Sequence, residues 1–527
     1  MPTKIDKIIV TNIGLLKAKY KPQGVGRIQA AIKDLIKADK SRGLQTVLVA
    51  LDDALAMGKL SAKPVKTAGD PRQNKTAIDA IYRAAAPDYL MLLGSYDVIP
   101  HQDLKNPLYT KPSGDDPDRL AYGDIPYDCE HTYSQDPADF VGSTRVVGRL
   151  PDITGATDPA YLVKLLTTAA RYRTLDAQTL RNYFAITAQI WEQSTQLSLT
   201  NTFGNDQTLE DVPPRNFKWA ANLIRRRSHF FNCHGAPDSP QFYGQPASGK
   251  EEYPVSLDAA YINGKIAAGT VAAAECCYGG QLYPLSATQN QLGMCNTYLF
   301  NGAYGFFAST TIAYGPSKGN AQADLLCQYF LQNVLAGASL GRAVLEARQK
   351  FVRTASPPDP SDLKTLAQFI LYGDPSITLL KVAQGAAAPA GSVKALAFKA
   401  SRVDRHDRRR ILFRQGLSLG ENVPVPRKTR TRPSKGVLAA LRGKARDFKL
   451  EPGAALSFIV RHPAKLKAMP KNMLDRESVP TAFHVLFADR KEKTSKRKDQ
   501  PAIFQIAAVV GKEVNGRLVS VTKIHSR

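Results

Sequence analysis

Two hydrophobic periodicities alternate along the first 380 residues, and this alternation limits the folds open to the chain. Apolar runs of strand length recur between segments whose apolar residues have helical spacing. The expected strands are Ile8–Thr11, Thr46–Leu51, Tyr89–Leu93, Tyr183–Ile190, Ser228–Cys233, Gly269–Cys276 and Tyr304–Ser309. The amphipathic helices expected between them include Arg27–Ala38, Ala77–Ala85, Ala160–Tyr172, Phe217–Arg226, Ala321–Leu335 and Leu340–Arg353. This order predicts an α/β fold with a mainly parallel sheet flanked by helices.

The length of 527 residues predicts more than one domain, because a single hydrophobic core stops growing well below this size. A break near Arg171–Asn182 separates an expected N-terminal α/β sub-domain, 1–175, from a second α/β sub-domain, 176–382. The segment Ala383–Ser392 reads AQGAAAPAGS, a composition typical of linkers. We therefore expect a linker over residues 383–436.

The last part of the chain, 437–527, differs in pattern and in charge. Short strand-like runs at Leu456–Val460, Phe483–Phe487 and Ile503–Val510 are separated by basic loops, which predicts a small β-rich module. From Gly391 to Arg527 the chain has 32 Lys and Arg against 11 Asp and Glu, so this region carries +21 of the net +25. Clusters such as Arg405–Arg410 and Arg427–Lys435 are compatible with nucleic acid, with an acidic partner protein, or with a solvated basic surface.

The sequence also favours a compartment and excludes some classes of protein. No apolar stretch approaches the length of a membrane span, and Met1–Lys7 leads into Ile8–Val10 without the apolar region of a signal peptide. The six cysteines follow neither a disulfide framework nor a metal-binding spacing. We expect a cytoplasmic protein with free thiols, no membrane partner, no metal and no cofactor.

A histidine closes one of the predicted strands. Ser228–Cys233 is followed directly by His234 and Gly235, and the carboxyl end of a strand is where α/β proteins build sites. Glycine at this position lets the main-chain N–H approach a substrate closely. By itself a His-Gly pair is more often only a turn.

A cysteine closes a second predicted strand 43 residues later. Gly269–Cys276 continues into Cys277, Tyr278 and two glycines. If the two strands are parallel neighbours, their ends bring a thiol and an imidazole together. The alternative is a buried strand whose cysteines only pack, but Glu275 and the glycines are poor core residues.

These two strand ends resemble the caspase–hemoglobinase superfamily. Glu275-Cys276-Cys277-Tyr278-Gly279-Gly280 is similar to the legumain pattern Glu-Ala-Cys-x-x-Gly and to the caspase pattern Gln-Ala-Cys-x-Gly. Both alignments place Cys277 at the nucleophile and Cys276 at the small residue before it. Cys276 remains the reserve nucleophile.

Further segments narrow the resemblance to gingipain-like peptidases over about residues 8–382. Asp88–Gly94 with Val98–Pro100 is similar to their "YVLLVGD…IP" strand. Three more segments, Asp118 with Tyr122-Gly-Asp124, Val147–Pro151 and Leu371–Ser376, are similar to their "sDxxY", "GRLP" and "GDPS" motifs. We interpret these flanking motifs as markers of the fold, and 176–382 as the catalytic caspase-like sub-domain.

The resemblance implies a cysteine endopeptidase with a His234/Cys277 dyad and no essential third carboxylate. It implies that the N–H groups of Gly235 and Cys277 face the oxyanion. In clostripain-like and metacaspase-like relatives an acid two residues before the cysteine lines a pocket for a basic P1 side chain, so Glu275 implies cleavage after Arg or Lys. A preference for Asn at P1 is also compatible with Glu275, and a preference for Asp is disfavoured. The alternative to a pocket role is that Glu275 pairs with a neighbouring Arg.

The chain departs from gingipains in two ways that affect function. Gingipains carry signal and pro-segments whereas this chain has neither, and its doubled cysteine is unusual, which favours an intracellular, regulated peptidase acting on a protein substrate. Cleavage of its own basic segment between Arg402 and Lys435 is one possible form of regulation. The competing hypothesis is a catalytically silent caspase-like scaffold whose basic domain binds nucleic acid or an acidic partner.

Overall fold

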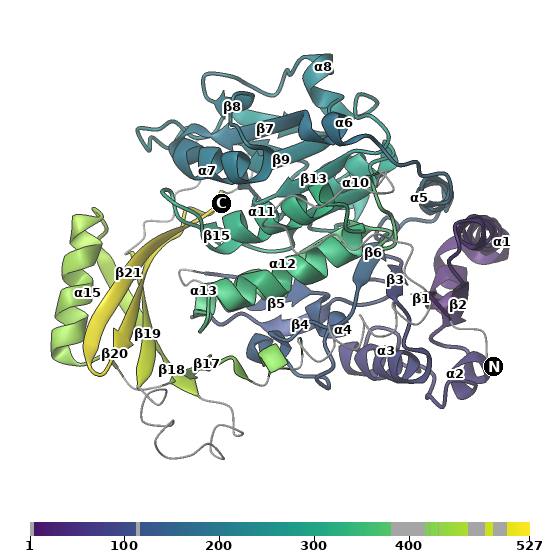
Figure 1. Ribbon diagram of the computed structural model, residues 1–527, viewed down its shortest axis with the longest axis horizontal. Coiled ribbons are helices and arrows are strands. Elements are labelled where there is room, and N and C mark those ends of the chain that lie inside the picture. Colours follow the sequence, from purple (N-terminus) through teal and green to yellow (C-terminus); the bar gives the residue numbers. More distant parts are fainter. Residues whose placement is uncertain are drawn as a thin grey trace.

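A large mixed sheet forms the centre of the protein in the computed structural model (Figure 1). The structure describes residues 5–111, 116–380, 416, 418–420, 422–429, 432–461, 480–488 and 503–527. In the described chain the sheet has the order β2-β1-β3-β6-β16-β14-β13-β9-β7-β8. Its strands are β1 (Lys7–Thr11), β2 (Thr46–Ala50), β3 (Tyr89–Leu93), β6 (Val147–Leu150), β7 (Tyr183–Ala188), β8 (Leu209–Val212), β9 (Ser228–Asn232), β13 (Val271–Ala274), β14 (Gly305–Ser309) and β16 (Phe369–Gly373).

All neighbouring strands of this sheet are parallel except the pair β14 and β16. Every residue of β1, β3, β7, β9, β13, β14 and β16 is buried, because helices cover both faces of the sheet. Strands buried on both faces read as continuous apolar runs, which is why the sequence pattern located them well. The expected α/β fold with a mainly parallel sheet is confirmed.

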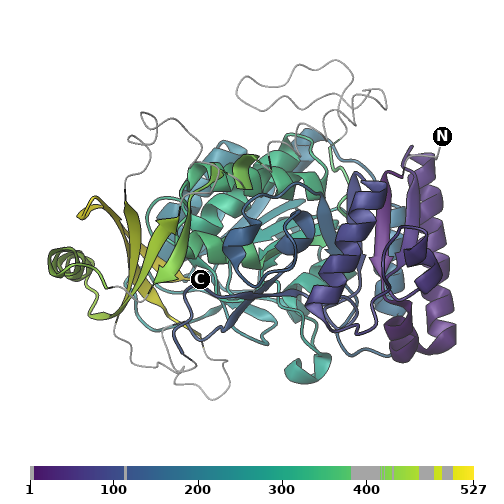
Figure 2. The same ribbon diagram turned by 90° about the horizontal axis from the view of Figure 1, so that it is seen from below.

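Helices surround the sheet (Figure 2), and several of them begin at a residue whose side chain caps the first turn. For example, Asp70 accepts hydrogen bonds from two N–H groups of the first turn of α3, and Asp359 forms a capping box with Asp362 at α13. The helices are α1 (Ile13–Ser41), α2 (Ala54–Gly58), α3 (Pro71–Ala85), α4 (Ile125–Asp128), α5 (Ala160–Ala170), α6 (Ala177–Arg181), α7 (Glu192–Phe203), α8 (Ala221–Ile224), α9 (Ala259–Ile262), α10 (Met294–Phe300), α11 (Gln322–Leu335), α12 (Leu340–Thr354) and α13 (Pro360–Gln368). Three short 3-10 turns are η1 (Pro137–Phe140), η2 (Gln189–Trp191) and η3 (Leu285–Thr288).

The helix expected over Phe217–Arg226 is much shorter in the structure, where only α8 is helical. The side chain of Asn216 accepts a hydrogen bond from the N–H of Lys218 (3.0 Å), and the indole of Trp219 donates to Ser256 O (2.7 Å). A local Asn turn competes with the first turn of a helix. None of the described helices has the length and apolar character that a membrane span requires.

A second, antiparallel sheet with the order β15-β21-β20-β19-β18-β17 lies at the end of the molecule away from the N-terminus (Figures 1 and 2). We call the part of it that follows residue 422, together with α15 (Lys435–Asp447), the C-terminal module. Its strands are β17 (Val425–Thr429), β18 (Pro452–Arg461), β19 (Thr481–Ala488), β20 (Ala507–Val514) and β21 (Arg517–Ser526). The expected β-rich C-terminal region is confirmed, and β17 lies within the range predicted to be a linker.

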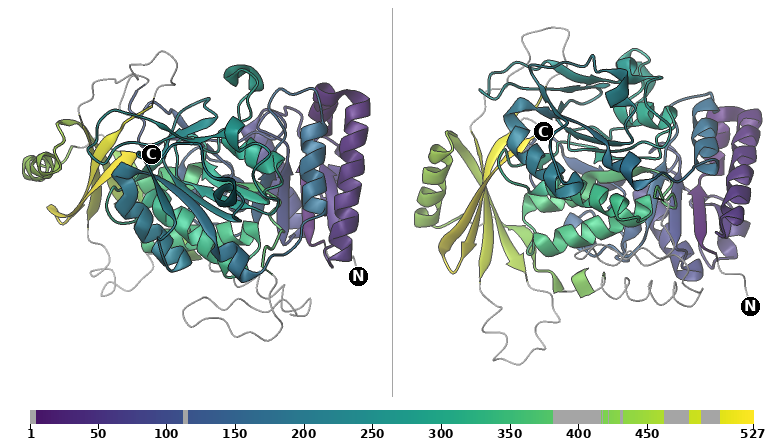
Figure 3. Two further views of the ribbon diagram at one scale, coloured as in Figure 1. Left: turned by 90° about the horizontal axis from the view of Figure 1, so that it is seen from above. Right: turned by 45° about the horizontal axis from the view of Figure 1, so that its top comes forward.

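The first strand of this second sheet, β15 (Tyr314–Gly315), belongs to the α/β part of the chain. It pairs antiparallel with the end of β21. The C-terminus of the chain therefore lies among α7, α11 and β15, close to the edge of the large sheet, in all views (Figure 3). The basic run Arg405–Arg410 lies outside the described residues.

The flanking motifs of the sequence have structural contacts. Arg149 is fully buried and forms two hydrogen bonds with the carboxylate of Asp124 (2.8 and 2.7 Å). Lys7 contacts both Asp39 (3.0 Å) and Asp374. Such buried pairs fix the relative position of β1, β6 and the turn after β16, which agrees with the interpretation of these motifs as fold markers.

Short additional strands are β4 (Gln102–Lys105) with β5 (Leu120–Gly123), and β10 (His234–Gly235) with β11 (Gln241–Tyr243) and β12 (Val255–Asp258).

Candidate active site

The parallel pairing of β9 and β13 brings the two predicted site segments to one edge of the sheet. Phe231 lies opposite Ala274, so the chain leaves both strands at the same level. A Cβ atom on Gly235 would lie 1.8 Å from the main-chain oxygen of Cys277. The two segments therefore touch through their main chains, and only glycine fits at position 235.

His234 is buried and held in one orientation. Its Nε2 lies 2.8 Å from Oε1 of Gln245, whose own amide nitrogen donates to the main-chain oxygens of Gly249 (3.4 Å) and Lys250 (3.2 Å). Because Oε1 can only accept, the neutral imidazole carries its proton on Nε2 and leaves the Nδ1 lone pair free. Among the described atoms Nδ1 has no hydrogen-bond partner. Burial lowers the pKa of His234 to about 4.

Cys277 is buried on the side of the sheet edge that faces the C-terminal module. Its Sγ accepts a hydrogen bond from Ala313 N (3.3 Å) and lies 3.6 Å from Ala313 O. Burial raises the pKa of the Cys277 thiol to about 12. In the described structure no hydrogen bond joins this sulfur to His234, so the two groups form a neutral thiol and a neutral imidazole here.

Cys276 packs against different neighbours from Cys277, although the two residues are adjacent in the bend and turn that follow β13. It packs in the core of the large sheet, where its Sγ lies 3.9 Å from Phe231 O, whereas Cys277 belongs to a cluster that includes Ile312 and Phe458. Burial is the main reason why the pKa of Cys276 lies well above its ordinary value, and the neighbouring Cys233 side chain raises it further. All six cysteines are free thiols, and within the described residues no group of His, Cys, Asp and Glu is arranged to hold a metal ion.

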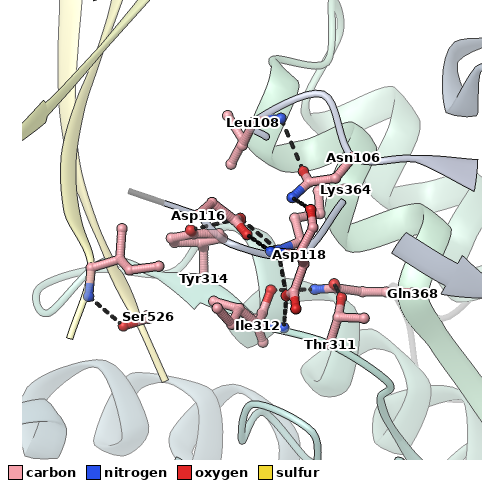
Figure 4. A network of polar contacts seen from close by, with 12 residues as sticks. Asn106, Leu108, Asp116, Asp118, Thr311, Ile312, Tyr314, Lys364, Gln368 and Ser526 are labelled. Atoms are coloured by element: carbon pink, nitrogen blue, oxygen red, sulfur yellow. Dashed lines mark hydrogen bonds and ion pairs between the residues drawn. The ribbon is translucent and has the colours of Figure 1, made fainter. Parts of the chain in front are cut away.

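A buried polar network holds the loop that contacts Cys277 (Figure 4). Asp118 accepts hydrogen bonds from Ile312 N (2.8 Å) and from the Tyr278 hydroxyl (2.8 Å), which come from the two sides of the site. Lys364 on α13 contacts Asp118 (3.3 Å) and Asp116 (2.6 Å). Burial alone would lower the pKa of Lys364, but the two carboxylates raise it above its ordinary value. The charged network thus holds the main chain at Ile312 and the side chain of Tyr278, the residue that follows Cys277.

Arg527 fills a buried pocket beside Cys277. Its Nη2 donates to Asp324 Oδ1 (2.7 Å) and to Pro316 O (2.8 Å), and its Nε lies 4.0 Å from Glu275 Oε2. The guanidinium carbon lies 4.6 Å from the ring centre of Trp191. All of these groups are buried, so the pocket binds a guanidinium through charge, hydrogen bonds and an aromatic face.

The main chain of Arg527 is bound as well. Its N–H donates to Ala313 O (3.0 Å), and its main-chain oxygen lies 3.3 Å from Cys277 N and 3.5 Å from Gly235 N as acceptor. Ser526 pairs with Tyr314, so the segment adds an antiparallel strand to β15. Arg527, which follows the last residue of β21, therefore occupies the site with its main-chain oxygen at the two N–H groups that the resemblance implied for an oxyanion.

The two carboxyl groups of the pocket, Glu275 and Asp324, have pKa values that depend on burial, on each other and on Arg527. Burial, followed by the neighbouring Asp324 carboxylate, raises the pKa of Glu275, while Arg527 lowers it. Burial also raises the pKa of Asp324 against the opposing effect of Arg527. Two carboxylates without solvent compete for one guanidinium, so the site requires a cation to remain charged.

Four residues around the site could not be recognised from the sequence: Trp191, Gln245, Asp324 and Arg527. Trp191 is one of two tryptophans in the chain, which is a weak signal, and Asp324 lies in the first turn of an amphipathic helix, where an acid is ordinary. Gln245 lies in a loop without a motif. Arg527 belongs to a region that the charge pattern assigned to other partners.

The chain is similar to known proteins along most of its length. Residues 2–380 match the family model for "Peptidase family C25", and no curated protein matches the chain. A solved structure described as that of a protease shares 12% identity, covers 100% of this chain and 98% of its own, and has a TM-score of 0.45. Separase in the separase–securin complex of Saccharomyces cerevisiae shares 11% identity over 45% of this chain and 14% of its own, with a TM-score of 0.29. Since the family model spans most of the sequence, the chain is a cysteine peptidase that belongs to peptidase family C25, the gingipain family.

Proposed function

We propose that the protein is an endopeptidase that cleaves protein substrates after basic residues, arginine above lysine, with Cys277 as nucleophile and His234 as proton carrier. One observation carries this proposal. The guanidinium of Arg527 lies near the acids Glu275 and Asp324. The main-chain oxygen of the same residue accepts a hydrogen bond from the N–H of Cys277. A P1 arginine bound in this way presents its carbonyl carbon to the sulfur.

In the proposed reaction a substrate strand pairs with β15 and the thiol proton of Cys277 passes to Nδ1 of His234. The sulfur then attacks the P1 carbonyl carbon, and the resulting oxyanion accepts hydrogen bonds from Cys277 N and Gly235 N. The C–N bond breaks as His234 returns the proton to the leaving amine. Water hydrolyses the thioester and restores the free thiol.

Arginine is favoured over other P1 residues by the shape and charge of the pocket. A planar guanidinium donates to Asp324 and to Pro316 O at once and lies against Trp191, whereas a lysine ammonium is a single point with no planar face. A P1 aspartate would meet Glu275 and Asp324 as like charges. An asparagine would satisfy hydrogen bonds but leave the acids without a cation.

The test compares the full chain with Cys277→Ala and Cys276→Ala on fluorogenic peptides. The same set is prepared with Arg527→Ala, whose pocket lacks the residue that fills it here. We expect Cys277→Ala to abolish cleavage and Cys276→Ala to keep most of it, because the two side chains pack against different neighbours. Cleavage that survives in Cys277→Ala, or no cleavage in any Cys277-containing chain, would contradict the proposal and would favour the catalytically silent scaffold.

The P1 preference is tested with peptides that differ only in Arg, Lys, Asn or Asp at that position. We expect the order Arg, Lys, then Asn and Asp. Glu275→Gln should reduce the Arg preference more than it reduces labelling of Cys277 by a thiol reagent. Equal cleavage of the Arg and Asp peptides would contradict the proposal that Glu275 and Asp324 form the P1 pocket.

Three further parts of this proposal concern the basic region and the location. Autoprocessing between Arg402 and Lys435 is supported by the many basic residues of a segment that lies partly outside the described residues. New N-termini that appear in the wild type and not in Cys277→Ala would reveal it. Binding of nucleic acid or an acidic partner and a cytoplasmic location remain hypotheses, which pull-down and cell fractionation would test.

A further inference from the structure

The end of β21 is bound in the candidate active site as a peptide strand would be. Three kinds of contact occur together: strand pairing with β15, a side chain in the acidic pocket, and a carbonyl oxygen at the N–H groups of Gly235 and Cys277. Extended peptides commonly bind proteins by adding a strand to an exposed sheet edge, with side-chain pockets giving specificity. Here the added strand comes from the same chain.

The segment is an anchored part of the C-terminal module. Ser526 Oγ accepts a hydrogen bond from Ile506 N (2.7 Å) and donates to Phe504 O (2.5 Å), and β21 pairs with β20 over most of its length. Ile524 packs in the cluster that also contains Cys277. The module therefore supports the strand from one side, and the α/β domain binds it from the other.

Occupancy of the site closes it. Cys277 and His234 are each only 1% exposed, and the Arg527 guanidinium is completely buried. A substrate needs the β15 edge, the acidic pocket and the oxyanion N–H groups, and all three are already filled. A ligand tethered in this way acts at a high effective concentration, so a free peptide competes poorly with it.

We propose that the C-terminal module is a tethered inhibitor of the peptidase, whose segment His525–Arg527 occupies the P3 to P1 positions with Arg527 in the P1 pocket. This inference rests on the proposed function of the same site. The C-terminal module thereby acquires a role that its charge does not suggest. Activation then requires the end of β21 to leave β15.

The experiment measures alkylation of Cys277 by iodoacetamide in the full chain, followed by mass spectrometry of the peptide that contains it. The variants are Arg527→Ala and a deletion of residues 525–527. Arg517→Ala is the matched control, because Arg517 is an exposed arginine at the other end of the same strand. Cys295, which is fully buried away from the pocket, reports loss of the fold.

We expect Cys277 to be alkylated at least about tenfold faster in Arg527→Ala and in the deletion than in the wild type or Arg517→Ala, a difference of about 1.4 kcal/mol in occupancy. Labelling of Cys295 should not change. A synthetic peptide that ends in Ile-His-Ser-Arg should restore protection of Cys277 in Arg527→Ala. If the deletion exposes Cys295 as well, the single substitution decides the question.

Equal alkylation of Cys277 in the wild type and in Arg527→Ala, with Cys295 protected, would overturn the inference. Peptide hydrolysis measured on the same samples separates this result from failure of the proposed function. If Cys277 is alkylated faster in Arg527→Ala but no peptide is hydrolysed, the tethered occupant is supported and the proposed endopeptidase activity is contradicted. If all four proteins hydrolyse the peptide at the same rate, the endopeptidase activity is supported and the inhibitory role of the C-terminal module is contradicted.

Discussion

Gly315 lies over the acidic pocket, and its replacement by alanine should block arginine selectively. A Cβ atom at this position would lie 2.3 Å from Arg527 Nη2 and 2.7 Å from both Arg527 Nε and Asp324 Oδ2. These separations are far below van der Waals contact, so the guanidinium must move away from Asp324. Hydrogen bonds to charged groups are worth about 1.5–3 kcal/mol. The loss of this bond predicts that Gly315→Ala lowers kcat/KM for a P1 Arg peptide by about 10- to 150-fold.

The assay compares P1 Arg and P1 Lys peptides in chains that carry Arg527→Ala, so that the site is open in both. A lysine ammonium is shorter and lacks the planar fork, so we expect a smaller loss and a lower ratio of Arg to Lys cleavage. Gly436→Ala is the control, because a Cβ there meets nothing within 4 Å. Arg cleavage by Gly315→Ala within about twofold of the parent would refute the pocket geometry on which the magnitude depends.

Two other perturbations test the site and its scaffold. Asp118→Asn should lower kcat/KM about 10- to 150-fold, because Asp118 orders Ile312 and Tyr278 through charge-assisted hydrogen bonds worth about 1.5–3 kcal/mol. Asp103→Asn, which weakens the contacts to the Tyr133 hydroxyl, should not lower it, and equal effects would contradict a positioning role for Asp118. Burial lowers the pKa of His229 to about 3. Below pH 6.5 the unfolded chain therefore binds a proton at this histidine that the folded chain excludes. As a result, the free energy of unfolding falls by about 1.4 kcal/mol per pH unit between pH 6.5 and pH 3. Urea unfolding at pH 7, 6 and 5 should show a shallower pH dependence in His229→Phe, and an unchanged slope would exclude this histidine as a cause.

The sheet could be predicted well from the sequence because its strands are buried on both faces. Runs such as Tyr89–Leu93 contain nothing but apolar residues, and their limits agree with β3 to the residue. The pattern failed where burial is partial or the element is short. β21 alternates buried and exposed positions irregularly and ends in a polar, basic stretch, so it has no apolar run to detect.

The two ends of the proposed dyad could also be anticipated, because each residue closes a strand of the parallel sheet. Glu275 was recognised through its spacing to Cys277. Its partner Asp324 could not be recognised, since it lies 49 positions along the chain on α11 and only the folded sheet brings the two carboxylates together. Arg527 is farther still. Local periodicity carries no information about which distant side chain fills a pocket.

The two pocket acids connect specificity with regulation. Glu275 and Asp324 are both fully buried, and burial raises the pKa of each, so an empty, dry pocket would keep at least one of them protonated. A guanidinium opposes this rise in pKa at both acids, and any cation that enters gains this compensation together with its hydrogen bonds. The same energy that selects arginine in a substrate therefore also retains Arg527. A site built to bind basic side chains is consequently easy to close with one from its own chain, and substrate and tether must compete for the same two carboxylates.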